Sequence, residues 1–407
     1  MLQATGAFAI VDYWIYGSWE GKTGDKITQS LNLLQIVMSL LLFTRAYRKR
    51  GRVAAGGILA IVMASFLLLS TLWSIDPQTT IRRGVIYLFF VIGTIGIAGN
   101  LDGDDFMELL GVTCLLSAIA SLLLLTFSPD ASLMGDELRG IFSHKNVLGE
   151  VMATGALASL HGLRVGRKRW RKTVMLILFT AVAMASRSAT SIMTIFVYCC
   201  ISAITSFIRK GGAARIMTII SIMLLLPAVV VAAAFPDSLL ELIGKDPTLT
   251  GRTDLWALVL TYIAQRPLLG WGYSAFWSPI NIDANEISTV LGWSVPEAHN
   301  GVLEMLLEVG FVGTAVFLVL WVRNLVLSLC CIFTPAKELA ITSLLCCVGI
   351  FLVGVTEQVL VDPSFGSVSV FFVTGLMSER AVRVARQKRT SRRSRWMVGS
   401  FETLRLR

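Results

Sequence analysis

Long apolar runs recur along almost the whole chain, and they limit its fold more than any other feature of the sequence. A helix of roughly 20 apolar residues crosses about 30 Å of hydrocarbon, and only helices and closed barrels can do so with every backbone group paired. The chain is 55% hydrophobic and only 15% charged, a composition that excludes a water-soluble fold. The sequence therefore predicts an all-α, polytopic transmembrane bundle.

The runs predict twelve helices, of which the first, sixth and seventh are short. Their approximate limits are 3–17, 29–47, 54–73, 79–99, 106–128, 147–163, 172–186, 188–208, 214–235, 300–325, 339–361 and 366–384. We therefore divide the chain into four parts. They are helices 1–9 within residues 1–235, a periplasmic loop region at 236–299, helices 10–12 within 300–384, and a basic cytoplasmic tail at 385–407.

Lys and Arg gather on one side of this arrangement, which holds 26 of the 36 basic residues. Cytoplasmic loops retain positive charge during insertion, so we expect a multi-pass protein of the bacterial inner membrane with both termini in the cytoplasm. The basic residues form no single patch with stacking aromatics, which argues against a nucleic-acid partner. The seven cysteines lie in or beside apolar runs without metal-ligand or redox spacing, so we expect no metal and no cofactor.

The segment RGIFSHKNVLG (139–149) gathers polar side chains just before a predicted helix on the outer side. These residues are Arg139, His144, Lys145 and Asn146. Cations oppose the dipole at a helix N-terminus, so an anionic ligand would account for them. The alternative is a solvated helix cap, with Ser143 or Asn146 as the capping residue.

The segment ASRSATS (185–191) places Arg187 between two apolar runs that are so close together that this residue must lie at or just inside the membrane. Burying a guanidinium there costs roughly 2.5–3.5 kcal/mol even on the permissive insertion scale, so the side chain needs a partner. A phosphate would be a suitable partner. The alternative is an arginine whose long side chain reaches out to the membrane surface.

The predicted outer loop combines two arginines, Arg252 in GRTDLW and Arg266 in RPLLGWGYSAFW, with several aromatic residues. The aromatic candidates are Trp256, Trp271, Tyr273 and Trp277. A guanidinium binds phosphate through two parallel hydrogen bonds, and aromatic faces stack on sugar rings, so this mixture suits a sugar attached to a phosphate. The alternative is an aromatic belt that lies flat on the bilayer surface.

The segment EAHNGVLEMLLEVGFVG (297–313) places His299 at the outer mouth of the tenth predicted helix. An imidazole with a reference pKa near 6.5 can accept a proton from a sugar hydroxyl at neutral pH without a metal. Glu304 and Glu308 are four residues apart and share a helix face, from which they would orient the imidazole or pair with a buried arginine. The alternative is that His299 caps the helix and the two glutamates pair structurally.

Five segments occur in one order: FSHKNVLG, SRSATS, GRTDLW, RPLLGWG and AHNGVLE. Together with the predicted helices, they resemble the O-antigen ligase and exopolysaccharide polymerase superfamily of bacterial membrane proteins, over roughly residues 70–315. The FSHKNVLG segment is most similar to the exopolysaccharide polymerase branch. The resemblance implies a glycan donor on undecaprenyl diphosphate, a diphosphate held by Arg187 and Arg252, and deprotonation of the acceptor hydroxyl by His299.

The predicted function is that of a polysaccharide polymerase, a metal-independent membrane glycosyltransferase of exopolysaccharide biosynthesis. Polyprenyl diphosphate is already a good leaving group, and paired guanidiniums would neutralise its developing charge. The expected partners are the lipid-linked donor, a glycan acceptor, membrane lipid and other polysaccharide export proteins. The alternatives are an O-antigen ligase that transfers the glycan to lipid A core, a transporter or flippase for an anionic glycolipid, and a structural scaffold of an export complex.

Overall fold

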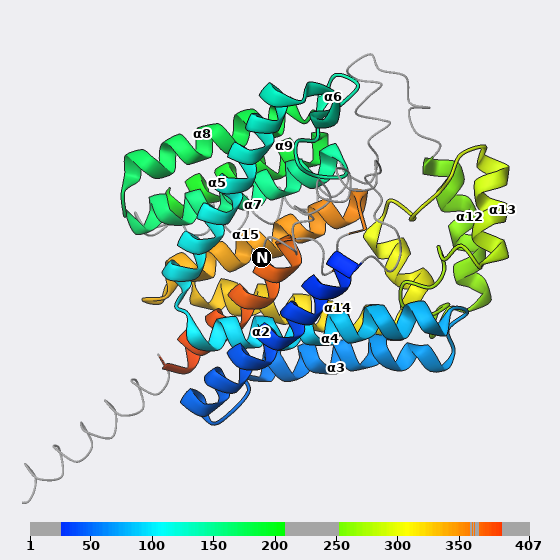
Figure 1. Cartoon of the computed structure of the whole chain (residues 1–407). Helices are drawn as coiled ribbons and strands as arrows, with labels where there is room; N and C mark the ends of the chain where they lie inside the picture. Colours follow the sequence, from blue (N-terminus) through cyan, green and yellow to red (C-terminus); the bar gives the residue numbers. More distant parts are fainter. Residues whose placement is uncertain (1–25, 208–251, 359, 361, 363–365, 385–407) are drawn as a thin grey trace, which may run out of the picture.

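The long apolar runs that the structure describes are helices, and the bundle that they form is almost free of sheet (Figure 1). The computed structural model describes residues 26–207, 252–358, 360, 362 and 366–384. Its strands are β1 (Leu133–Met134) and β2 (Glu137–Leu138), which pair antiparallel in a short hairpin. The predicted all-α, polytopic membrane bundle is thereby confirmed.

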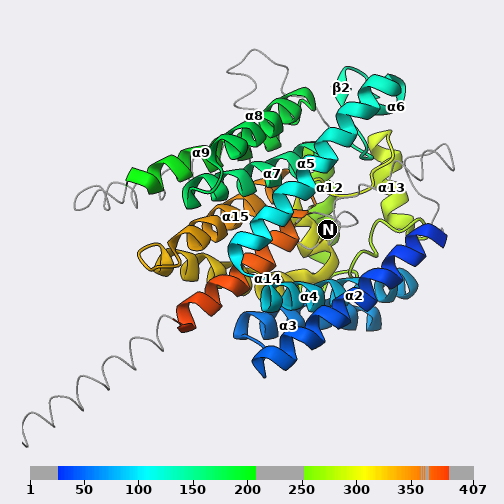
Figure 2. The same cartoon turned by 60° about the vertical axis from the view of Figure 1, so that its left-hand side comes forward.

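The helices form two outer groups with a third group between them (Figure 1 and Figure 2). One outer group contains α2 (Lys26–Arg50), α3 (Ala55–Leu69) with its 3-10 extension η2 (Ser70–Leu72), and α4 (Pro77–Asn100). The other contains α5 (Gly103–Phe127), α7 (Lys145–Val165), α8 (Arg169–Ala185) and α9 (Ala189–Phe207). Between the two groups lie α14 (Gly301–Cys331), α15 (Lys337–Thr356) and a helix over 366–384.

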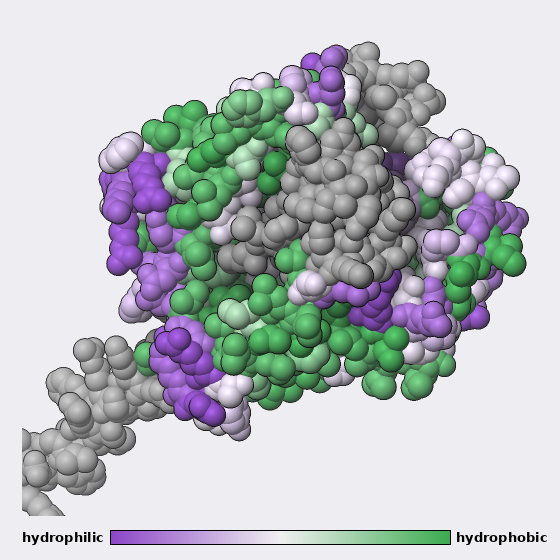
Figure 3. Space-filling view, in the orientation of Figure 1, coloured by the Kyte–Doolittle hydropathy of each residue, from purple (hydrophilic) through white to green (hydrophobic). Residues whose placement is uncertain are grey.

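Burial differs strongly between helices in these groups. The most apolar stretch of α15 is 83% buried, whereas that of α2 is 11% buried. The central helix therefore packs on all sides, and α2 presents most of its apolar side chains to the surroundings of the bundle. In Figure 3 this apolar surface separates hydrophilic residues over the α7–α8 turn and the end of α2 from those around α12 and α13. Such a band is the surface that a membrane-embedded bundle requires.

Local sequence signals set several of the helix starts. Asp76 accepts a hydrogen bond from Thr79 N at 3.1 Å and precedes Pro77, whose fixed φ suits the first helical position of α4. Asn300 caps α14 by accepting hydrogen bonds from two backbone N–H groups of its first turn. These caps fix where the chain enters the bundle. The Asn300 cap also holds in place the residue that directly follows His299.

Seven of the described helices are long and apolar enough to cross a membrane: α2, α3 with η2, α4, α5, α9, α14 and α15. The predicted runs at 147–163 and 366–384 are also helical, as is 172–186 except for its last residue. The predicted helices at 3–17 and 214–235, and the tail at 385–407, lie outside the described residues. The count of twelve and the division into four parts therefore stay predictions.

The region predicted as a periplasmic loop is more regular than the sequence indicates. Within its described part lie α12 (Arg252–Gln265) and α13 (Ile282–Leu291). They enclose a hydrophobic core of their own, in which Leu255, Trp271 and Phe276 are buried together with Leu307 of α14. The short helix α6 (Pro129–Ser132) lies at the same end of the bundle (Figure 1).

Helix α14 is broken at Gly310, whose φ of 63° and ψ of −168° no residue with a side chain adopts readily. The segment RPLLGWG fills the break. Trp271 N and Gly272 N donate to the carbonyls of α14 residues before the break, at 2.9 and 2.8 Å, and Phe311 N and Val312 N after it donate to carbonyls of the segment. This pairing satisfies the backbone groups freed by the break, as apolar surroundings demand, and ties the predicted outer loop to α14.

Candidate active site

Glu357, the residue that follows α15, is the meeting point of three elements. Asn146 at the start of α7 donates a hydrogen bond from Nδ2 to Glu357 Oε1 at 2.6 Å. Arg252 at the start of α12 places Nη2 3.8 Å from the same oxygen and donates from Nη1 to the carbonyl of Thr356 at 3.2 Å. The structure therefore brings together two residues singled out in the sequence, through a glutamate that was not.

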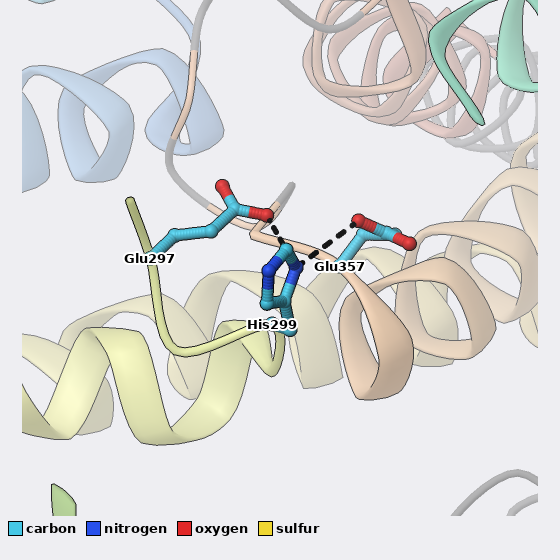
Figure 4. A group of neighbouring side chains, drawn as sticks. All are labelled: Glu297, His299 and Glu357. Carbon is cyan, nitrogen blue, oxygen red and sulfur yellow. Dashed lines mark ion pairs between the residues drawn. The ribbon is translucent and has the colours of Figure 1, made fainter. Parts of the chain in front are cut away.

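His299 lies between two carboxylates, as Figure 4 shows. Its Nδ1 is 3.0 Å from Glu297 Oε1 and 3.9 Å from Glu357 Oε2, and the three side chains are 23%, 22% and 14% exposed. The ring of Trp293 stacks on the imidazole with centroids 6.1 Å apart. The imidazole is thus partly shielded from water, paired with acids on one edge and covered on one face by an indole.

The backbone at His299 is strained and firmly held. Its φ is 48°, in the left-handed region that residues with a side chain rarely adopt. The peptide groups of the preceding Ala298 are bonded on both sides, because its N–H donates to Glu304 Oε2 at 2.7 Å and its carbonyl accepts from Trp256 Nε1 at 3.0 Å. Strain that the surroundings enforce in this way is typical of functional sites.

The pKa of His299 is raised to about 9. Burial disfavours the charged imidazolium and lowers the pKa, but the carboxylates of Glu297 and Glu357 outweigh that cost. His144 lies near the same charges, and burial lowers its pKa. The surroundings therefore favour the charged form of His299 and the neutral form of His144.

Arg187 lies on the turn between α8 and α9, at the end of the bundle where Glu357 lies. Its φ is 50°, so it shares the left-handed backbone of His299. Thr190 Oγ1, three residues on, is 2.9 Å from Thr356 Oγ1, which links this turn to the end of α15. The Arg187 side chain is exposed and makes no hydrogen bond or ion pair with another described residue. A guanidinium in this position is open to an anionic ligand.

Close packing of α7 against the same turn explains why small residues surround Arg187. A Cβ added at Gly149 would lie 2.8 Å from Ser188 Cβ and 2.5 Å from Ser191 Oγ. The glycine of FSHKNVLG and the serines of SRSATS therefore fit each other. Two of the sequence motifs are thus packing partners as well as carriers of charged side chains.

Other residues of the first motif support the loop beside the site. Lys145 pairs with Glu137 of β2 at 2.6 Å, and Arg139 Nε donates to the carbonyl of Ala131 at 3.1 Å. The residue that caps α7 is His144, whose Nδ1 accepts from Asn146 N at 3.2 Å. The expectation that Ser143 or Asn146 would be the cap is therefore wrong, because the imidazole nitrogen takes that role.

Arg266, Glu304 and Glu308 do not contact the imidazole. Arg266 lies over the ring of Trp271 at 4.1 Å and donates to the carbonyl of Trp73 at 3.4 Å. Glu304 is buried and accepts from Trp277 Nε1 at 2.8 Å as well as from the Ala298 amide. Glu304 therefore shapes the backbone that carries His299, whereas Glu308 lies one turn further in and is also buried.

The aromatic candidates divide into two pairs. Trp271 and Tyr273 are only 7% and 4% exposed, so their faces are used in packing and neither is open to a sugar ring. Trp256 and Trp277 are partly buried, and each donates an indole hydrogen bond that positions the His299 loop. The indole that covers the imidazole, Trp293, was not among the candidates.

Sequence reasoning also missed Glu297 and Glu357. Glu297 stands two residues before His299, and Glu357 closes an apolar run. An acid at the end of such a run is a recognisable signal, because ionisable residues at a membrane boundary need a partner. Which partner it has depends on contacts with α7 and α12, more than a hundred residues away in sequence.

Glu297, His299 and Glu357 also have the donor atoms to hold a divalent cation, since one ligand atom of each lies within 4.8 Å of the others. One imidazole and two carboxylates suit a metal such as zinc or manganese. The same atoms already form ion pairs, and a charged His299 together with Arg252 balances the two carboxylates without a metal ion. The geometry is compatible with both arrangements.

Comparison with known proteins finds a family that matches part of the chain. Residues 173–318, a range that includes Arg187, Arg252 and His299, match the O-antigen ligase family. These matches confirm the resemblance to the O-antigen ligase and exopolysaccharide polymerase superfamily, and the chain is a multi-pass bacterial membrane protein.

A curated relative makes the comparison more specific. The chain is 27% identical over 263 residues to the exopolysaccharide production protein ExoQ of Rhizobium meliloti (strain 1021). The alignment covers 61% of this chain and 60% of that protein. The chain therefore matches about three fifths of the relative's length.

Proposed function

We propose that the protein is a polysaccharide polymerase that transfers an undecaprenyl-diphosphate-linked glycan to a sugar acceptor at the periplasmic membrane face. The observation that carries the proposal is the convergence of His299, Arg252 and Asn146 on Glu357 at one end of the bundle. It joins a base to an arginine that can bind phosphate, as transfer from a glycosyl diphosphate requires. The relative's role in exopolysaccharide production supports polymerisation.

Arg187 and Arg252 bind the diphosphate in this proposal. The Arg187 side chain has no partner among the described residues, and Arg252 holds Glu357 only loosely, at 3.8 Å. Both guanidiniums are thus available for bidentate hydrogen bonds to phosphate oxygens. They stabilise the negative charge that grows on the leaving diphosphate as its bond to the anomeric carbon breaks.

His299 accepts the proton of the acceptor hydroxyl while the hydroxyl oxygen forms its bond to the anomeric carbon. Glu297 and Glu357 stabilise the imidazolium that results, since both lie within 4 Å of Nδ1. The same carboxylates raise the pKa of His299 to about 9, so the group is a stronger base but is neutral in only a small fraction of molecules at pH 7. The proposed rate therefore rises with pH through the neutral range.

Trp256 and Glu304 are positioning residues in this mechanism, because they bond the peptide groups of Ala298. Trp256 and Trp277 also remain the proposed walls for the sugar rings. The proposed reaction uses no metal ion, because a charged His299 and Arg252 together neutralise Glu297 and Glu357. The gathering of basic residues at the other end of the bundle supports cytoplasmic termini and a periplasmic site.

The second candidate is an O-antigen ligase with lipid A core as acceptor, and the match of residues 173–318 to the O-antigen ligase family favours it. The chemistry on the donor side is the same for both candidates. A transporter is less well supported. The break in α14 resembles the discontinuous helices of transporters, whose free backbone groups bind substrate and ions. Here hydrogen bonds from the segment RPLLGWG occupy these backbone groups.

The test uses the purified full chain in lipid vesicles with an undecaprenyl-diphosphate-linked oligosaccharide. We expect a ladder of longer lipid-linked glycans from the wild type and from Arg167→Gln, which removes an exposed arginine at the opposite end of the bundle. His299→Ala and Arg252→Ala should give no ladder. Transfer only after addition of lipid A core would identify a ligase, and passage of the intact donor across the vesicle without elongation would refute both candidates.

A further inference from the structure

A cavity lies at the end of the bundle opposite His299. It has a volume of about 240 Å³, is open on one side, and is lined by the end of α2, the α2–α3 connection, α4 and the last turn of the helix over 366–384. Its walls combine apolar side chains, including Phe43, Ile95 and Leu376, with four arginines. These are Arg50, Arg52, Arg380 and Arg383.

The charge in this cavity is not balanced by its walls. None of the described residues that line it is acidic. Arg50 Nε donates to the carbonyl of Gly99 at 2.7 Å and Arg380 Nη1 to the carbonyl of Leu101 at 3.2 Å, so both guanidiniums are bonded to neutral groups. Arg383 pairs with Glu379, outside the lining, and Glu379 also pairs with Arg323. The cavity therefore keeps a strong positive charge.

The position of the cavity indicates what would neutralise that charge. It lies where α2 ends in Arg48, Lys49 and Arg50, in the hydrophilic region at the lower left of Figure 3. Apolar side chains of α2 that lead up to this end are exposed, and Tyr47 at the rim is 50% exposed. A guanidinium cluster beside an apolar outer wall lies at the level of lipid headgroups.

The size of the cavity is also informative. Pockets that enclose a whole drug-sized ligand usually hold roughly 300–1,000 Å³, so this cavity suits a headgroup whose hydrocarbon chains lie outside it. The exposed apolar face of α2 gives those chains a surface to lie on.

We propose that this cavity binds the phosphate headgroup of an anionic phospholipid, with its acyl chains along α2. Arg50 and Arg380 face the phosphate from two different helices, and Arg52 supplies a third guanidinium at the α2–α3 connection. The ligand ties α2 and α4 to the helix over 366–384, and it does so far from the glycan site. The proposal is therefore independent of the polymerase activity.

The test is native mass spectrometry of the full chain in detergent, titrated with phosphatidylglycerol or with neutral phosphatidylethanolamine. At roughly 1 kcal/mol for each basic residue near an anionic lipid, Arg50→Gln with Arg380→Gln should weaken phosphatidylglycerol binding about thirtyfold. The matched control is Arg45→Gln with Arg48→Gln, which removes the same charge from exposed positions of α2 outside the cavity. It should bind as the wild type does.

A third variant keeps the test informative if the double variant misfolds. Arg52→Gln removes a guanidinium that makes no hydrogen bond to a described residue, and it should weaken phosphatidylglycerol binding about fivefold. Equal binding of both lipids, equal loss in the control pair, or displacement of phosphatidylglycerol by millimolar inorganic phosphate would each overturn the proposal. The last result would mean a site for a free anion instead of a lipid.

Discussion

Replacing Glu297 by Gln should move the pH dependence of glycan transfer toward acid. The carboxylate lost is the nearer of the two, 3.0 Å from His299 Nδ1, and Glu357 remains at 3.9 Å. An opposite charge at such a distance raises a histidine pKa by roughly 1–3 units, and partial exposure of this pair favours the low end. The pKa of His299, about 9 in the wild type, should therefore fall to roughly 7.5–8.

The sign of the effect on rate follows from the role of a base. Only neutral His299 can accept a proton, and below its pKa the neutral fraction falls about tenfold for each pH unit. A lower pKa therefore gives more neutral imidazole at pH 7. We expect kcat/KM at pH 7 to rise roughly ten- to twentyfold in Glu297→Gln, reduced by the lower reactivity of a weaker base, and to reach its plateau at lower pH.

The assay is kcat/KM for glycan elongation measured between pH 6 and pH 10, with NMR of labelled histidines as an independent measure of the pKa. The chain has three histidines, so variants of His144 and His161 suffice to assign the signals. Glu286→Gln is the control, because it removes an exposed carboxylate of α13 in the same region. Identical pH profiles for the wild type and Glu297→Gln would refute the assignment of His299 as the base. The same holds if NMR gives the same His299 pKa for both proteins.

Three further outcomes follow from the structure. Gly310→Ala should destabilise the protein by about 1–3 kcal/mol or more through backbone strain, which would lower its unfolding temperature in detergent. The control Gly135→Ala should destabilise it less, because Gly135 has the same φ but no atom lies within 4 Å of the added Cβ. Asn146→Ala removes the 2.6 Å hydrogen bond to Glu357 and should lower kcat about tenfold, whereas Asn285→Ala on α13 should not. A chelator such as EDTA should leave elongation unchanged, and loss of activity that zinc or manganese restores would assign the Glu297 carboxylate to a metal instead.

The helices could be predicted from sequence because their signals are local. Runs of apolar residues, a Pro at a first helical position and an Asp or Asn ahead of it act within one or two turns. The predicted range 366–384 is helical throughout its length, and the predicted start at 188 lies one residue before the start of α9. The break at Gly310 was not predicted, because its stability depends on hydrogen bonds from Trp271 and Gly272 in another segment.

The candidate site was predictable only in part. Arg187, Arg252 and His299 stand out in the sequence because a charged or titratable side chain between apolar runs needs a partner, and the structure places all three at one end of the bundle. Trp271 and Tyr273 look like sugar-binding residues by composition, yet the fold buries them. Composition reveals which side chains are aromatic, but burial depends on what packs over them.

The sequence by itself determined that this is a helical membrane protein and which polar residues are out of place in it, since both properties follow from the transfer of single residues out of water. Only the tertiary structure decided which of these residues meet. Glu357 draws Asn146, Arg252 and His299 together from three segments, and the four arginines of the lipid cavity come from three others. Contacts over such separations depend on how helices pack, and helix packing is set by side-chain shape along the whole of each interface instead of by any local pattern.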